Sequence, residues 1–380
     1  QYDQPLCSGG EVTFELNGQP KTVHLTRIHL EEDVAKNMHF ADASGVDFNR
    51  AGTPLMEIVT EPDIHSADEA MAFLQALKQI LAYGGISDCN LEQGNIRCDV
   101  NCSVRASETS RLGTKTEIKN MNTFKGVHRA LSYEIRRQVN DLGKGREIVQ
   151  ETRRWDDEAG QTFSMRSKED AHDYRYFPEP DLLPVELEQS DVERWQAQLP
   201  EKPAARRARM AEEYGIPEYD AGVLAADRAV ADFFEATVQS SGNAKASSNW
   251  IMTEMLRSLS EADLDIGSIN VTPETLGQLI KLVDGKILNM PTAREVFAVM
   301  FAEGGDPDAI VKAKGLAQVS DTGAIEAMVD QIIADHAQSV EDYRGGKQAA
   351  LQFLIGQVMR ISKGKANPAM VRDLFLQRLG

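Results

Sequence analysis

The spacing of apolar residues changes character near Pro200. Before this residue, short runs alternate apolar and polar positions with a period of two, which predicts β-strands. From Pro203 onward, helical spacing continues nearly throughout, and β-branched runs are few. The chain has 380 residues, which is more than usually fold around one hydrophobic core. The sequence therefore predicts an α+β domain followed by helical domains.

The predicted strands have one apolar face and one charged face. Residues 12–30 predict a hairpin that turns at Asn17-Gly18, a dipeptide typical of two-residue turns. Residues 96–104 and 114–119 show the same alternation, with charged side chains gathered on one side. We expect mainly antiparallel sheets that pack on one face and leave the other to solvent or a ligand.

Two helices are expected among these strands. One follows a capping box at Ser66 and Glu69, and the other covers about 123–141. Near the C-terminus, helices are expected at about 323–337, 339–361 and 367–379, with starts at Ser339 and Asn367. We expect three domains, which would cover residues 1–199, 200–305 and 306–380.

Aromatic, ionisable and proline residues concentrate between His172 and Asp181. Aromatic residues are 6% of the chain, yet three occur here beside His172 and Arg175. The prolines impose an extended path, so the segment suits the wall of a ligand pocket. The other interpretation is a buried turn with a satisfied Arg–Asp pair.

Two acidic clusters are candidate cation sites. His29 and Glu32 belong to a run of acids at a strand end, and oxygen ligands of this kind favour Mg²⁺ over zinc. Asp157 lies in Trp155-Asp156-Asp157-Glu158, ahead of a turn at Ala159-Gly160. A solvated charged face and an acidic hairpin tip are the corresponding alternatives.

Basic residues near these clusters suit phosphate, since Arg offers a planar fork of donors and Lys a point charge. The candidates are Lys115, Lys119, Arg153 and Arg154. The sequence has neither a P-loop nor a dinucleotide fingerprint, so any nucleotide site must be unconventional.

Charge is distributed unevenly along the chain. The net charge of −18 argues against nucleic-acid binding over the whole surface, but seven Lys/Arg face one acid from Arg344 onward. Four cysteines without zinc-ligand spacing, no apolar span and no signal peptide indicate a protein of the reducing cytoplasm that does not enter a membrane.

Long blocks of the sequence resemble one family. The GatB subunits of the aspartyl/glutamyl-tRNA(Asn/Gln) amidotransferases, which belong to GatCAB complexes, have similar blocks in the same order. In this chain they read FNRAGTPLMEIVTEPD at 48–63, GTKTEIKNMN at 113–122, ETRRW at 151–155 and HDYRYFPEPD at 172–181. The C-terminal FLIGQ at 353–357 and KGKANP at 363–368 also agree, so the resemblance spans essentially the whole chain.

The resemblance implies a cradle-like, mainly antiparallel catalytic domain, a helical domain and a small YqeY-like helical tail. It implies that the protein uses ATP and Mg²⁺ to phosphorylate the side-chain carboxylate of tRNA-bound Glu or Asp. Ammonia from a glutaminase subunit, GatA, would then displace phosphate, and a small third subunit, GatC, would complete the heterotrimer.

The same resemblance assigns roles to residues. Glu32 and Asp157 would be catalytic metal ligands, with Glu158 as the alternative to Asp157 and His29 in the same set. The basic residues Lys115, Lys119, Arg153 and Arg154 would hold phosphate, and His172 and Arg175 would position substrate. The tail would bind tRNA phosphates through Arg344, Lys347, Arg360, Lys363 and Lys365.

Two expectations concern what the chain does by itself. Members of the family carry an N-terminal segment of roughly ninety further residues with part of the metal site, so we expect this chain alone to lack full kinase activity. The competing hypothesis is a tRNA-binding scaffold whose partners hold all the chemistry. A scaffold has no need of the acidic sites around Glu32 and Asp157.

Overall fold

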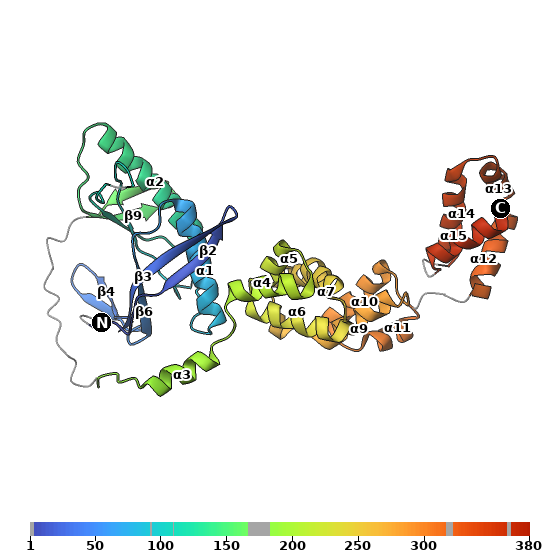
Figure 1. Cartoon of the computed structure of the whole chain (residues 1–380), viewed down its shortest axis with the longest axis horizontal. Coiled ribbons are helices and arrows are strands. Elements are labelled where there is room, and N and C mark those ends of the chain that lie inside the picture. The colour runs from blue at the N-terminus through green and yellow to red at the C-terminus, as the bar shows by residue number, and fades with distance from the viewer. Residues whose placement is uncertain (1–3, 92, 109, 166–182, 317–321, 363–365) are drawn as a thin grey trace. The chain divides into compact units, whose positions relative to one another are not determined.

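The computed structural model describes residues 4–91, 93–108, 110–165, 183–316, 322–362 and 366–380 (Figure 1). The chain divides into two compact units, Gln1–Ala204 and Ala205–Gly380. Strands lie in the first unit and helices make up the second, so the predicted α+β fold with a helical C-terminal part is confirmed.

The first sheet is built around one long strand, β3 (Gln19–Glu32). Its first half pairs antiparallel with β2 (Glu11–Leu16), and its second half pairs with β1 (Cys7–Ser8) and β6 (Pro54–Thr60). The hairpin between β2 and β3 turns at Asn17-Gly18 as predicted, with φ of 53° and 74°. Both residues adopt the left-handed conformation that this short turn requires.

The second sheet has the order β10-β9-β8-β7 and one parallel pair, β8 with β9. Its strands are β7 (Val100–Cys102), β8 (Thr116–Lys119), β9 (Thr152–Asp156) and β10 (Gln161–Ser164). The strand predicted over 96–104 is wrong in length. Asn120 turns the chain with φ of 69° at the end of β8, so residues before Asp99 have no strand beside them.

A short ribbon and two helices complete the first unit's core region. The ribbon pairs β4 (Lys36–His39) with β5 (Ser44–Asp47). The predicted helices are confirmed as α1 (Ala67–Tyr83) and α2 (Phe124–Gly143), which pack side by side against the strands (Figure 1). Their apolar faces share one core with both sheets, including Phe73, Ile118, Val127 and Trp155.

A buried carboxylate at the start of α1 makes stability depend on pH. Glu69 accepts a hydrogen bond from the His65 amide and pairs with Lys21 at 2.9 Å. Burial alone would raise the pKa of Glu69, but the bonds from Lys21 and His65 outweigh it and hold the pKa below the ordinary 4.5. The unfolded chain therefore takes up this proton at a higher pH than the folded chain.

We expect Glu69→Gln to lower the free energy of unfolding at pH 7, because Gln cannot form the charged pair with Lys21. The difference from the parent protein should shrink as the pH falls from 4.5 through the lowered pKa of the folded state. Urea unfolding at several pH values measures this. Glu147→Gln, at an exposed position, is the control, and a pH-independent difference would contradict the assignment.

Helices of the second unit form a core between Met210 and Val311. Trp250, Phe234 and Phe297 lie in this core, and a π-helical turn at Ile251–Met255 joins α7 to α8. Preceding this core, α3 (Gln189–Gln198) has no buried residue. The remaining helices are α4 (Pro203–Tyr214), α5 (Glu218–Leu224), α6 (Arg228–Ser241), α7 (Ala244–Trp250), α8 (Leu256–Ala262), α9 (Pro273–Asp284), α10 (Met290–Glu303) and α11 (Pro307–Lys314).

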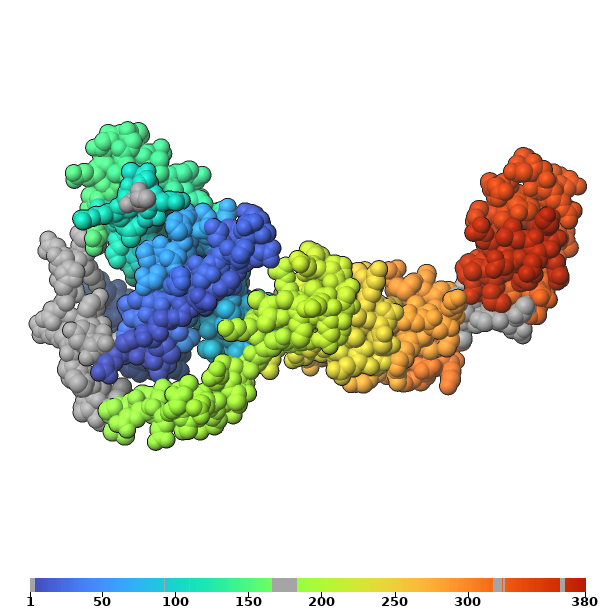
Figure 2. Space-filling view, in the orientation of Figure 1, coloured from blue at the N-terminus to red at the C-terminus, as the bar shows by residue number. Residues whose placement is uncertain are grey.

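The C-terminal helices have a separate core, made of residues from Ile325 to Leu379 (red in Figure 2). They are α12 (Thr322–Asp335), α13 (Ala337–Arg344), α14 (Gln348–Ile361) and α15 (Pro368–Leu379). Asn367 caps α15 as predicted. The single helix predicted over 339–361 is wrong, because the chain breaks at Gly345-Gly346, where Gly346 has φ of 95°. Ser339 lies inside α13 and does not start a helix.

The three cores fall in the order of the predicted domains, but the domain limits stay a prediction. Val311 of α11 packs in the second core although α11 begins after residue 305. Within the described ranges, no helix has the length and apolar character that crossing a membrane requires.

Candidate functional site

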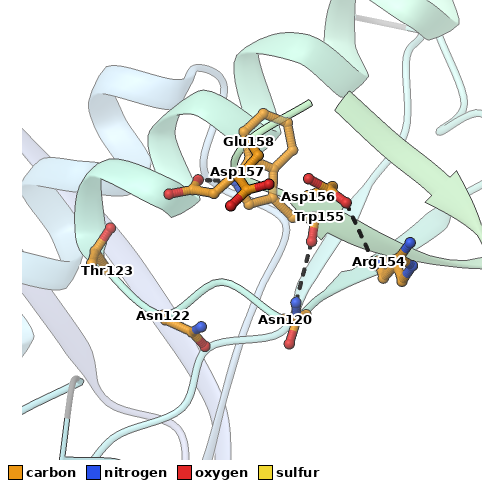
Figure 3. A pocket seen from close by; sticks show the side chains of 8 residues that line it. All are labelled: Asn120, Asn122, Thr123, Arg154, Trp155, Asp156, Asp157 and Glu158. Carbon is orange, nitrogen blue, oxygen red and sulfur yellow. Dashed lines mark hydrogen bonds and ion pairs between the residues drawn. The ribbon is translucent and has the colours of Figure 1, made fainter. Parts of the chain in front are cut away.

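A polar pocket of about 230 Å³ opens where the β9–β10 turn meets the start of α2 (Figure 3). Three acidic side chains from the turn, one arginine from β9 and two asparagines from the loop before α2 line it. These and the other lining residues are Asn120, Asn122, Thr123, Arg154, Trp155, Asp156, Asp157 and Glu158. The predicted turn at Ala159-Gly160 is therefore a hairpin tip, and the acidic residues just before it line the pocket.

Asp157 is held by two neighbours. The Trp155 indole N–H donates to Oδ1, and Arg129 Nη2 of α2 donates to Oδ2 at 2.7 Å. The side chain of Asp157 is still 53% exposed, so the carboxylate remains accessible from the pocket. Glu158 is exposed at the pocket's edge. The structure therefore places both alternative carboxylates at one opening.

Hydrogen bonds fix the opposite side of the pocket. Asn120 Nδ2 donates to the Trp155 carbonyl at 3.2 Å, which ties the loop before α2 to β9 (Figure 3). Thr123 caps α2 by accepting from the Gly126 amide at 2.9 Å. The positive end of a 20-residue helix dipole thus faces the carboxylates of the turn, an arrangement that also suits a bound anion.

Arg154 is the basic residue of the pocket. Its guanidinium is half-exposed, lies 3.6 Å from Asp156 Oδ2 and stands over the Phe163 ring at 5.4 Å. Lys115 is exposed in the loop before β8. Lys119 pairs with Asp99 at 3.1 Å and Glu117 at 3.2 Å. Burial lowers the pKa of Lys119, but the hydrogen bonds and charges of Asp99 and Glu117 together outweigh burial, and the pKa lies above its ordinary value.

Arg153 lies away from the pocket in a buried network. Its guanidinium donates to Thr162 Oγ1 at 2.8 Å, to the Thr162 carbonyl at 2.9 Å, and to Glu151. Strand alternation explains the difference from Arg154, because neighbouring residues of β9 point to opposite faces. Arg154 is thus better placed than Arg153 to meet a phosphate.

His29 and Glu32 lie on opposite faces of β3, because their spacing is odd and strand side chains alternate. His29 is 4% exposed. Its Nδ1 accepts from Arg27 at 3.2 Å and lies 3.9 Å from Glu57 Oε2, while Nε2 has no hydrogen-bond partner among the described residues. Glu32 is exposed beside the turn at Gly52.

The described residues do not bring the predicted magnesium ligands together. Among the described residues, which include Glu32, Asp157 and His29, no three His, Cys, Asp or Glu side chains could hold a metal ion together. The residues therefore do not fit a complete magnesium site by themselves, and the metal stays a prediction. Burial also raises the pKa of the Cys98 and Cys102 thiols to about 12, so both are neutral thiols at neutral pH.

In the folded tail, basic residues lie beside acidic residues that precede Arg344 and so were left out of the count from Arg344 onward. Arg378 pairs with Asp330 at 3.0 Å and Lys347 with Asp342 at 2.9 Å. From residue 322 to 379 there are seven Lys/Arg and six Asp/Glu, so the folded tail is close to neutral. Arg344 ends α13, and Arg360 is exposed in the last turn of α14. Any tRNA contact must therefore use a local basic face.

Four predicted site residues lie outside the described part of the chain. They are His172, Arg175, Lys363 and Lys365. Sequence reasoning in turn missed Arg129, Asn120 and Thr123. Only Thr123 had a signal, as the expected start of a helix beside an acidic cluster.

Two family models match the chain. The GatB/GatE catalytic domain covers residues 1–193 and the GatB domain covers residues 232–379. The chain belongs to the GatB family. Similar proteins, each named as the B subunit of aspartyl/glutamyl-tRNA(Asn/Gln) amidotransferase, occur in Chlorobium chlorochromatii and Caldicellulosiruptor bescii, at 50% identity over 380 residues and 49% over 384. A protein of that name in Ralstonia pickettii is 49% identical over 393 residues.

Each alignment covers the whole of this chain and 80% of the relative. The resemblance predicted from sequence blocks is therefore confirmed for the full 380 residues. The pocket at the β9–β10 turn falls inside the GatB/GatE catalytic-domain match.

Proposed function

We propose that this GatB family member activates the side-chain carboxylate of Glu-tRNA(Gln), Asp-tRNA(Asn) or both by phosphorylation with ATP. Ammonia then replaces the phosphate and gives Gln-tRNA or Asn-tRNA. A carboxylate is a poor acyl donor, and attached phosphate provides a leaving group. The protein then has to hold phosphate and offset the charge that develops on it.

The observation that supports this proposal is the composition of the β9–β10 pocket. Arg154 and the N-terminal end of α2 provide positive potential for a phosphate, while Asp157 and Glu158 provide oxygen ligands for a cation. Amides at Asn120 and Asn122 add neutral donors. Few other tasks need both charge types within one small polar opening.

ATP and Mg²⁺ are part of the proposal. Bound Mg²⁺ would offset negative charge on transferring phosphate. Because the described residues do not assemble a full ligand set, we assign them only positioning and charge: Arg154 toward phosphate, and Asp157 or Glu158 toward the cation.

The partners follow from the relatives' names, which describe one subunit of a larger amidotransferase. We propose that a glutaminase subunit, GatA, supplies ammonia and that a small subunit, GatC, completes the complex. We also propose that Arg344, Lys347 and Arg360 contribute to tRNA binding, and that the complex works in the cytoplasm. The other candidate function is the tRNA-binding scaffold, which has no need of the carboxylates gathered at the β9–β10 pocket.

Removing charge from both acidic sites separates the enzyme from the scaffold. We expect the double variant Glu32→Gln, Asp157→Asn, in the assembled complex, to lose amide formation by about 100-fold or more while tRNA affinity changes less than about twofold. Aminoacyl-tRNA analysis and filter binding measure the two quantities. Asp42→Asn with Glu147→Gln, both exposed, is the matched control. Unchanged amide formation in the first pair would favour the scaffold.

A further inference from the structure

One carboxylate of α2, Glu134, is fully buried beneath the second sheet. Its Oε1 accepts from Thr116 of β8 at 2.8 Å, Gln138 at 3.0 Å and Arg137 at 2.6 Å. Its Oε2 accepts from Thr162 of β10 at 3.0 Å and from Arg137 at 2.9 Å. Arg153 of β9 completes the shell, with Nε 3.5 Å from Oε2. The carboxylate thus contacts every strand of the second sheet except β7.

Glu134 is charged in the folded protein. Burial raises its pKa, but hydrogen bonds from Arg137, Gln138 and Thr116 outweigh it, and the pKa lies below its ordinary value. A buried charge with this many donors is costly to disturb, because removing it leaves guanidinium and hydroxyl groups without acceptors. The bonds to Glu134 therefore fix the position of α2 relative to the β9–β10 hairpin.

The same helix and hairpin form the candidate site. Arg129 of α2 binds Asp157, and Tyr133 of α2 packs on Trp155 with ring centroids 6.3 Å apart. Together with Glu134, these contacts attach the hairpin to α2 at three positions between Arg129 and Glu134. Since the start of α2 lines one side of the pocket and the hairpin tip lines the other, a slip between them would change the pocket's width.

We propose that Glu134 is a positioning residue for the β9–β10 pocket. It sets the register of the hairpin on α2 and so holds Asp157 opposite Asn122 and Thr123, without touching substrate. The expected effect of Glu134 on catalysis rests on the proposed function. Its expected effect on the hairpin rests on the contacts alone. Displacements near 1 Å in an active site can cost about 100-fold in rate.

Glu134→Gln keeps the side chain's size and removes its charge. In the assembled complex we expect kcat for amide formation to fall by about 10- to 100-fold with KM for tRNA unchanged, because tRNA is proposed to bind elsewhere. We also expect the indole ¹H–¹⁵N resonance of Trp155 to shift. The chain has three Trp residues, so Trp155→Phe assigns this signal. Glu134→Asp keeps the charge and should recover part of kcat.

Thr162→Val keeps the inference testable if Glu134→Gln does not fold, because it leaves the Glu134 carboxylate in place and removes the hydroxyl that donates to it and accepts from Arg153. We expect it to shift the same resonance and lower kcat less. A folded variant that keeps the wild-type Trp155 resonance and the wild-type kcat would overturn the inference. A fall in kcat that only matches the fraction of unfolded protein would overturn it as well.

The two proposals can fail separately. If Glu32→Gln with Asp157→Asn abolishes amide formation and Glu134→Gln changes nothing, only the positioning role is wrong. If that pair leaves amide formation intact, the proposed function is wrong, and the Trp155 resonance still decides whether Glu134 positions the hairpin.

Discussion

Asp157→Asn is expected to lower the rate of amide formation on tRNA by about 100-fold or more, the largest catalytic effect of any single change in this chain. Asn keeps the size of Asp and an oxygen that accepts from the Trp155 indole, but it loses the charge that Arg129 and a cation would contact. The hairpin should therefore stay in place while the chemistry fails. Single-turnover assays on aminoacylated tRNA measure the effect.

Two further variants show whether Asp157 acts as a cation ligand or only through its ion pair with Arg129. Glu158→Gln tests the other carboxylate at the opening, and a larger loss there would move the cation ligand to Glu158. Arg129→Gln removes the guanidinium that pairs with Asp157 and leaves the Asp157 carboxylate unchanged. If Arg129→Gln and Asp157→Asn lower the rate equally, Asp157 acts through its ion pair, and its assignment as a ligand is wrong.

Phe375→Ala is expected to unfold the C-terminal helices. Phe375 is fully buried in the separate core of α12–α15, and truncating a buried Phe costs about 3–5 kcal/mol. A core in a bundle of fewer than about 80 residues supplies about the same amount of stability. The helices should lose amide protection in hydrogen exchange, while the core between Met210 and Val311 stays protected.

This change also tests the tail's role in binding tRNA. We expect affinity for tRNA to fall at least about tenfold, with a weaker salt dependence, because the basic side chains lose their common face. Phe353→Ala is the matched control, since Phe353 is 45% exposed, lies outside the buried core and packs on the His336 ring with centroids 5.4 Å apart. Unchanged tRNA affinity with an unfolded tail would show that tRNA binds elsewhere.

Local signals in the sequence were enough to predict much of the fold. Asn17-Gly18, Ser66 and Asn367 each specify a turn or cap through a few atoms of their own, and the structure has all three. The errors came from non-local causes. The strand predicted over 96–104 is shorter because its neighbour β8 ends. The helix predicted over 339–361 is divided at Gly345-Gly346, although the apolar spacing on both sides favours a helix.

The candidate site was less accessible to prediction. Charge type and the family resemblance led to Arg154 and Asp157. Strand alternation, however, separates Arg153 from Arg154 and His29 from Glu32, which the choice by charge type treated alike. Arg129 and Asn120 reach the pocket from distant segments through hydrogen bonds. No periodicity in one sequence encodes such contacts.

Strand β3 constrains how chains of this family can differ in length. Its first half is paired with β2 and its second half with β1 and β6, so it belongs to two ladders at once. Its register with β6 shifts between Leu25 and Arg27, and one residue inserted beyond this point would reverse the facing of the side chains that follow it, including His29. Length differences among relatives are therefore expected in the tip of the β4–β5 ribbon or in loops, where an added residue changes no register.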